Sequence, residues 1–172
     1  MNSVDIILPI YNSEKYIEKI INSIISQSYK NWKLIVIDDG SQDSTAEIIK
    51  KYLNDKRITL KTLKKNKGVS FCRNLALRYS KSNYVAFIDS DDIWENDKIL
   101  KQINFMEKNE YHFTYTNYVP FKSLSEKNNF KEIVPPKIMS FKTFVKNTSI
   151  GTSTMMIKRD LIKYEKFTNT KI

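Results

Sequence analysis

Short apolar runs alternate with segments of helical periodicity over the first two thirds of the chain. Runs rich in β-branched and aromatic residues, bounded by polar turns, are typical of buried strands in a parallel sheet. Apolar residues three and four positions apart in the segments between them predict helices with one buried face. The expected strands are 4–8, 32–37, 58–63, 84–88 and 113–118. Four helices are expected between and after them: one that begins after Ser13 as its N-cap, one that ends at Tyr52, and two that cover 69–79 and 95–108.

Alternating strands and helices with short connections predict a single α/β domain whose mostly parallel, mixed sheet has helices on both faces. Strand 58–63 alternates polar and apolar residues and is expected at a sheet edge. After Pro120 the pattern weakens: we expect a loop over 122–137, short helices over 140–146 and 159–164, and a strand over 152–157. The side chains expected to face inward include Tyr16, Leu53, Phe71, Cys72, Leu75 and Ala76.

Composition narrows the function classes. The 172 residues include only 3 glycines, and neither a P-loop nor a dinucleotide glycine fingerprint is present. The single cysteine, Cys72, cannot form an internal disulfide, no signal peptide is evident, and no apolar run approaches the ~20 residues of a membrane span. We therefore expect a cytoplasmic chain. Residues 120–172 carry 11 Lys or Arg against 4 Asp or Glu. This basic region either faces anionic lipid, nucleic acid or an acidic substrate, or is simply solvated. No signature of nucleic-acid binding accompanies the charge.

The chemistry concentrates at Asp89-Ser90-Asp91-Asp92, directly after the expected strand 84–88. Such neighbouring carboxylates repel one another unless a cation or hydrogen bonds compensate. Oxygen ligands of this kind suit Mg²⁺ or Mn²⁺, which bind a few carboxylates together with substrate phosphates. The competing interpretation is an acidic turn in which Asp91 or Asp92 caps a helix starting at Ile93.

Two other expected strands also end in polar residues, at 9–12 and 38–41. The ends of parallel strands share one rim of the sheet, and ligands of open α/β sheets bind at that rim. The convergence favours a binding site over an acidic helix cap.

Four segments in this order closely resemble family 2 glycosyltransferases, the inverting, nucleotide-sugar-dependent enzymes of the GT-A fold. They are 8–12 (LPIYN), 36–44 (VIDDGSQDS), 66–74 (NKGVSFCRN) and 87–92 (FIDSDD). The resemblance is strong over about residues 3–118 and weaker over 150–159. It implies that 1–119 form the nucleotide-sugar-binding core and that 120–172 begin the acceptor-side region of the same domain.

The resemblance also implies residue roles. Tyr11 would stack on a uracil-type base beside Pro9, and Asp39 would accept the base N–H. The alternative for Tyr11 is a turn aromatic resting on the core. Asp38 would cap the next helix or brace the loop. Arg73 would reach the base or phosphate, unless it forms a surface ion pair, and Lys67 would neutralise phosphate.

Asp89-Ser90-Asp91 matches the Asp-x-Asp motif of the family. Asp91 would hold Mn²⁺ or Mg²⁺, Asp89 would contact the ribose or the metal, and Asp92 would orient the sugar. Trp94 fits a family position that is often aromatic and is more typical of packing than of a sugar platform.

Inverting transfer needs a general base. The resembling family places it after the segment that 152–157 resembles, so we expect it beyond Ile172. The implied function is extension of a bacterial surface glycan from a UDP-sugar onto a glycan or lipid-linked acceptor. One alternative is a non-catalytic or truncated nucleotide-sugar-binding module that lacks the general base. The other is a nucleotidyltransferase, which is disfavoured because no Gly- and Arg-rich phosphate loop opens the chain.

Overall fold

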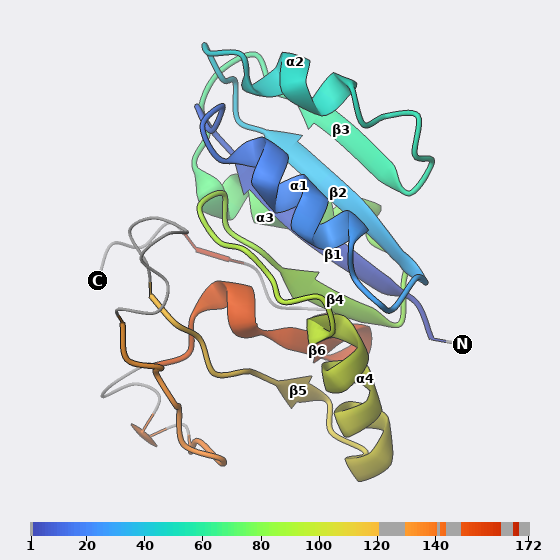
Figure 1. Ribbon diagram of the computed structural model, residues 1–172, viewed down its shortest axis with the longest axis vertical. Helices are drawn as coiled ribbons and strands as arrows, with labels where there is room; N and C mark the ends of the chain where they lie inside the picture. Colours follow the sequence, from blue (N-terminus) through green and yellow to red (C-terminus); the bar gives the residue numbers. More distant parts are fainter. Residues whose placement is uncertain (1, 121–129, 141, 144–148, 163–166, 169–172) are drawn as a thin grey trace.

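The computed structural model describes residues 2–120, 130–140, 142–143, 149–162 and 167–168, and shows one six-stranded sheet in the order β3-β2-β1-β4-β6-β5 (Figure 1). The strands are β1 (Val4–Ile10), β2 (Trp32–Asp38), β3 (Ile58–Thr62), β4 (Tyr84–Phe87), β5 (Phe113–Thr114) and β6 (Met156–Lys158). The helices are α1 (Ile17–Ile25), α2 (Thr45–Lys50), α3 (Val69–Tyr79) and α4 (Lys98–Asn109), with 3₁₀ turns η2 (Thr152–Thr154) and η3 (Arg159–Ile162).

The sheet is mixed and mostly parallel, as predicted. The central strand β1 pairs in parallel with β2 and with β4, and β2 pairs in parallel with the edge strand β3. Only β6 runs the other way, antiparallel to both β4 and β5. The carboxyl ends of β1, β2 and β4 consequently lie at one rim, which is where the sequence placed the candidate site.

Helices cover both faces of the sheet (Figure 1). On one face, α1 and α4 pack their isoleucines on β1, β2 and β4, and Ile49 of α2 joins them. On the other face, α3 packs Cys72, Ala76 and Leu77 against β1, β2 and β4. All seven residues of β1 are buried, so this apolar strand is solvent-excluded on both sides, as central parallel strands usually are.

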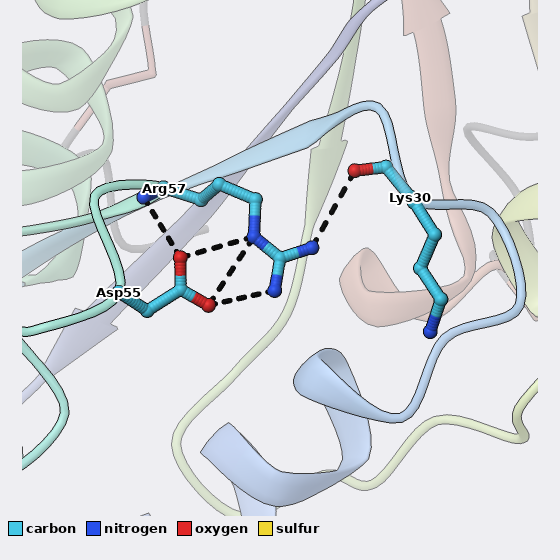
Figure 2. A network of polar contacts seen from close by, with 3 residues as sticks. All are labelled: Lys30, Asp55 and Arg57. Carbon is cyan, nitrogen blue, oxygen red and sulfur yellow. Dashed lines mark hydrogen bonds and ion pairs between the residues drawn. The ribbon is translucent and has the colours of Figure 1, made fainter.

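The end of the sheet opposite the rim is fastened by a polar network around Arg57 (Figure 2). The Arg57 guanidinium donates to both Asp55 oxygens, over 2.6–3.2 Å, and to the Lys30 carbonyl at 3.5 Å. It also lies 3.9 Å from the centroid of the Trp32 ring. Its hydrogen bonds lower the pKa of Asp55. The network joins the starts of β2 and β3.

Two helix starts differ from the prediction. Ser13 is not the N-cap of α1, because its hydroxyl donates back to the Tyr11 carbonyl and the helix begins at Ile17. α4 begins at Lys98 rather than at residue 95. The Gln27 side chain donates to the Glu95 carbonyl at 2.7 Å and accepts from the Ile99 N–H at 3.2 Å, a long-range contact that local pattern does not reveal.

Neither Asp91 nor Asp92 caps a helix, because the chain between Asp92 and α4 is irregular. The acidic-cap interpretation is therefore wrong.

The later elements are shorter than predicted. β5 stops at Thr114, and Tyr118 then forms an isolated bridge with Ile133. The expected strand 152–157 is divided, because the Gly151 carbonyl accepts both the N–H and the hydroxyl of Thr154 and closes η2 before β6 starts. Most of the predicted helix 140–146, the end of 159–164 and much of the predicted loop 122–137 lie outside the described residues.

Several expected burials are corrected as well. Cys72 and Ala76 are buried and Leu75 is half-buried, but Phe71 is exposed. Tyr16 and Leu53 are exposed because Tyr16 precedes the first turn of α1 and Leu53 follows the end of α2. Within the described ranges, no helix is long and apolar enough to cross a bilayer.

Candidate nucleotide-sugar site

The loops after β1 and β2 are joined by hydrogen bonds at the rim. The Ser41 hydroxyl accepts from the Asn12 N–H at 3.0 Å, and the Asn12 side-chain oxygen accepts from the Gln42 N–H at 2.8 Å. Asn12 has a φ of 47°, a left-handed conformation that asparagine tolerates. Tyr11 beside it is 45% exposed, so it does not rest on the core as the alternative required. Pro9 is buried inside β1, which continues to Ile10 and so passes the predicted end of the strand at residue 8.

Asp38, the last residue of β2, is fully buried. Its Oδ1 accepts from the N–H of Ser41 at 3.0 Å and from the hydroxyl of Ser41 at 2.5 Å. Asp38 therefore braces its own loop and does not cap α2, which begins at Thr45.

Asp39 holds the loop that precedes α3. Its two oxygens accept the N–H groups of Lys67 at 2.7 Å and of Gly68 at 2.8 Å. Gly68 has a φ of 91°, which favours glycine. Burial raises the pKa of the Cys72 thiol to about 12, aided by the charge of Asp39 and a hydrogen bond to it, so Cys72 is no nucleophile. Each Asp39 oxygen has a second lone pair, which leaves capacity for the predicted base N–H.

A basic hollow lies beside that loop. It has a volume of about 330 Å³ and is lined by Leu63, Lys64, Lys65, Lys67 and Phe71. The loop packs closely against Gly40, where an added Cβ would lie 3.1 Å from the Lys65 backbone and where φ is 78°. Phe71 faces this hollow, which is why the prediction of a buried Phe71 fails.

Arg73 of α3 and Asp89 after β4 form an ion pair of 2.5 Å. The Arg73 side chain is only 12% exposed, and that of Asp89 is 32% exposed. The pair is therefore not the surface ion pair of the alternative interpretation. It brings together two residues that the sequence assigned to different parts of the donor site, Arg73 to the base or phosphate and Asp89 to the ribose or the metal.

The acidic residues after β4 form a turn, in which the Asp89 carbonyl accepts from the Asp92 N–H at 3.2 Å. Asp91 is exposed, and Ser90 and Asp92 are half-buried. Burial raises the pKa of Asp92, and the charges of Asp91 and Asp89 add to this, while a hydrogen bond from Ser153 opposes it. The carboxylates are thus close enough to repel one another.

Ser153 in η2 is a site residue to which the sequence assigned no role. Its hydroxyl accepts from the Asp89 N–H at 2.9 Å, and its carbonyl accepts from the Trp94 indole N–H at 2.9 Å. Trp94 is buried, as the packing interpretation predicted. The only sequence signal for Ser153 was its place in the weaker part of the resemblance, 150–159.

Lys98 packs behind this turn. Its Nζ lies 3.8 Å from the centroid of the Trp94 ring and has no hydrogen-bond partner among the described residues. Burial lowers the pKa of Lys98 to about 7.

This turn can hold a divalent ion only if a bound substrate supplies the remaining ligands. Nowhere in the described ranges do three or more Asp, Glu, His or Cys side chains come together to enclose an ion. Asp91 is exposed at the rim, with Asp89 in the same turn. Mg²⁺ and Mn²⁺ often bind one or two carboxylates and take their other ligands from phosphates and water. The donor set is compatible with that arrangement.

The arrangement of strands and helices is the GT-A fold, and solved structures share it. S. aureus TarS 1–349, solved in complex with UDP, superposes with a TM-score of 0.78 at 24% identity, covering 94% of this chain and 48% of that one. Residues 5–164 match the family model for glycosyl transferase family 2. The chain therefore belongs to glycosyl transferase family 2.

Sequence relatives agree. An uncharacterized glycosyltransferase of Haemophilus influenzae is 38% identical over 172 residues, covering 99% of this chain and 68% of that protein. The UDP-Glc:alpha-D-GlcNAc-diphosphoundecaprenol beta-1,3-glucosyltransferase WfgD of Escherichia coli is 39% identical over 159 residues, covering 92% of this chain and 61% of WfgD. The chain thus spans about two thirds of the length of these relatives.

Proposed function

We propose that this chain is the nucleotide-sugar-binding part of a glycosyltransferase that uses a UDP-sugar and a divalent ion to extend a bacterial surface glycan with inversion. The observation that carries the proposal is the half-buried Arg73–Asp89 pair beside the exposed carboxylate of Asp91 at the rim. The names of two Escherichia coli relatives, WfgD and WfaP, state UDP-Glc as donor. Residues 1–119 would bind the donor, and 120–172 would begin the acceptor side.

The family resemblance suggests a role for each rim residue, and the geometry is compatible with these roles. The exposed ring of Tyr11 would stack on the base, bordered by Pro9, and Asp39 would accept the base N–H through its remaining lone pairs. Arg73 offers guanidinium N–H groups in a fork that matches diphosphate oxygens. Lys67 lies on the same rim and would add positive charge.

Asp91 and Asp89 would hold the ion, with Ser90 shaping the turn between them. When bound, Mn²⁺ or Mg²⁺ would offset the charge that builds on the leaving nucleotide. Asp92 would orient the sugar. Since Asp89 pairs with Arg73 and Asp92 bonds to Ser153, we assign the general base to neither of them.

The acceptor would be a glycan or a lipid-linked saccharide, because WfgD and WfaP are named for a diphosphoundecaprenol-linked acceptor. A cytoplasmic chain would meet such an acceptor at the inner face of the membrane, and the basic region 120–172 would favour anionic lipid there. Binding of the chain to anionic vesicles at low salt, and not to neutral ones, tests this part. Equal partitioning to both would contradict it.

A second candidate is a module that binds the nucleotide-sugar without transferring it. It is favoured by four rim carboxylates, each of which accepts a hydrogen bond or forms an ion pair: Asp38, Asp39, Asp89 and Asp92. A UDP-release assay with UDP-Glc and a lipid-linked GlcNAc acceptor separates the two. Acceptor-dependent release supports transfer, whereas donor binding without release supports the module.

A further inference from the structure

Hydrogen bonds join helix α3 to residues 167–168, which are far from it in the sequence. The Asn74 side chain donates to the Phe167 carbonyl at 2.8 Å and accepts from the Phe167 N–H at 2.9 Å. Four residues earlier on α3, the Ser70 hydroxyl donates to the Thr168 carbonyl at 3.0 Å. We call these four residues the α3 clamp. One amide thus satisfies both backbone groups of Phe167, which fixes the orientation as well as the position of that residue.

The α3 clamp holds an aromatic ring against the candidate site. The ring of Phe167 packs edge-on against Phe87, the last residue of β4, with centroids 5.3 Å apart. The guanidinium carbon of Arg73 lies 5.3 Å from the centroid of the same ring, within the range of a cation–π contact. Phe167 therefore fills the space between the end of β4 and the arginine that pairs with Asp89.

Arg73 is held from two sides as a result. Asp89 accepts from its Nη2, and Phe167 supports the guanidinium. The buried Nε–H of Arg73 has no partner in the described part of the chain. An unpartnered buried N–H is costly, and a phosphate oxygen that reached it would remove that cost. The arginine is thus oriented in advance and retains an unused donor.

We propose that Asn74 is a positioning residue for donor binding: by fixing Phe167 it holds the Arg73 guanidinium in the orientation that receives the diphosphate. The inference rests on the proposed function, since it assigns Arg73 to the donor phosphates. In this role Asn74 acts through Phe167 and Arg73 and not by contacting the donor itself. Sequence reasoning included Asn74 in the segment 66–74 but gave it no role.

Binding of UDP with Mn²⁺, measured by calorimetry, provides the first test. Loss of one such hydrogen-bonded contact is expected to weaken binding about fivefold in Asn74→Ala. Asn74→Asp, which keeps the acceptor for the Phe167 N–H, should weaken it less. The exposed Asn54→Ala is the matched control and should bind as the unaltered chain does.

A double-mutant cycle separates positioning from general stability. If Asn74 acts through Arg73, Asn74→Ala has no further effect on UDP affinity in an Arg73→Ala background, although both changes lower the melting temperature. Equal effects of Asn74→Ala in both backgrounds would overturn the proposal. So would an Asn74→Ala chain that binds UDP normally.

A second readout needs no nucleotide, so it separates failure of this inference from failure of the proposed function. The Arg73 Nε–H should give a distinct, slowly exchanging ¹⁵N NMR signal because it is buried. Asn74→Ala should shift that signal and speed its exchange, and Asn54→Ala should not. An unchanged signal overturns the positioning role whether or not the chain binds UDP.

Discussion

The Arg73 guanidinium of α3 lies 2.5 Å from the carboxylate of Asp89 at the end of β4. The two residues come from different elements, and both side chains are largely withdrawn from solvent. A charge-assisted hydrogen bond between side chains that are largely withdrawn from solvent is stronger than one between exposed side chains. This pair orients both the cationic group and the acidic turn at the rim.

Arg73→Lys should weaken UDP binding about tenfold. A lysine keeps the charge but loses the planar fork that pairs with oxygen atoms at two positions. Calorimetry measures the loss. Arg57→Lys is the matched control, because Arg57 is also an ion-paired arginine but lies at the opposite end of the sheet. It should lower stability and leave UDP affinity unchanged. Equal affinities in the two variants would contradict the assignment of Arg73.

Ser153→Ala should lower the free energy of unfolding by about 1–2 kcal/mol, because it leaves the Asp89 N–H without its partner. It should also weaken metal-dependent UDP binding severalfold, since the acidic turn loses its support from η2. Denaturant unfolding and calorimetry measure the two effects. Ser44→Ala is a suitable control, because the Ser44 side chain makes no capping bond at the start of α2. A Ser153→Ala chain with unaltered UDP affinity would show that η2 does not position the turn.

Lys98→Met should stabilise the chain at pH 6 by an amount that shrinks as pH rises. The folded-state pKa of Lys98 is lowered from 10.5 to about 7, so between these values the unfolded chain binds a proton that the folded chain does not. Stability of the unaltered chain relative to Lys98→Met therefore rises with pH across this window, by up to about 1.4 kcal/mol per pH unit. Below pH 7 the full cost of burying the charge is present.

The measurement is denaturant unfolding of both chains at several pH values from 6 to about 10. Lys101→Met, on the same helix but with an exposed side chain, should show no such trend. A stability difference between Lys98→Met and the unaltered chain that does not change with pH would contradict the shifted pKa.

Much of the fold was predictable from local pattern. The strands β1, β2 and β4 are buried on both faces, so each one appears in the sequence as an apolar run. The position of the candidate site at the rim was also predictable, because parallel strands end together and each of these three strands is followed by polar residues. The start of α4 was not predictable, because the side chain of Gln27, distant in sequence, determines it.

The candidate site was likewise predictable only in part. Asp39, Arg73, Asp89 and Asp91 were identified from motifs, and the structure brings Arg73 and Asp89 together. Ser153 and Asn74 were missed as site residues because their roles consist of contacts across 64 and 93 positions of sequence. No local spacing encodes such contacts. The roles of all of these site residues stay predictions: Pro9, Tyr11, Asp39, Lys67, Arg73, Asp89, Ser90 and Asp91.

In the proposed function, the rim formed by Arg73, Asp89 and Asp91 binds a nucleoside diphosphate with a divalent ion. Its most direct test is calorimetric titration of the chain with UDP, with and without Mn²⁺, repeated with Asp91→Ala and with Asp160→Ala as an exposed-carboxylate control. We expect UDP to bind and Mn²⁺ to strengthen the binding at least tenfold. Asp91→Ala should abolish this strengthening while the fold is retained, and Asp160→Ala should not. Absence of UDP binding, or an Asp91→Ala chain that responds normally to Mn²⁺, would contradict it.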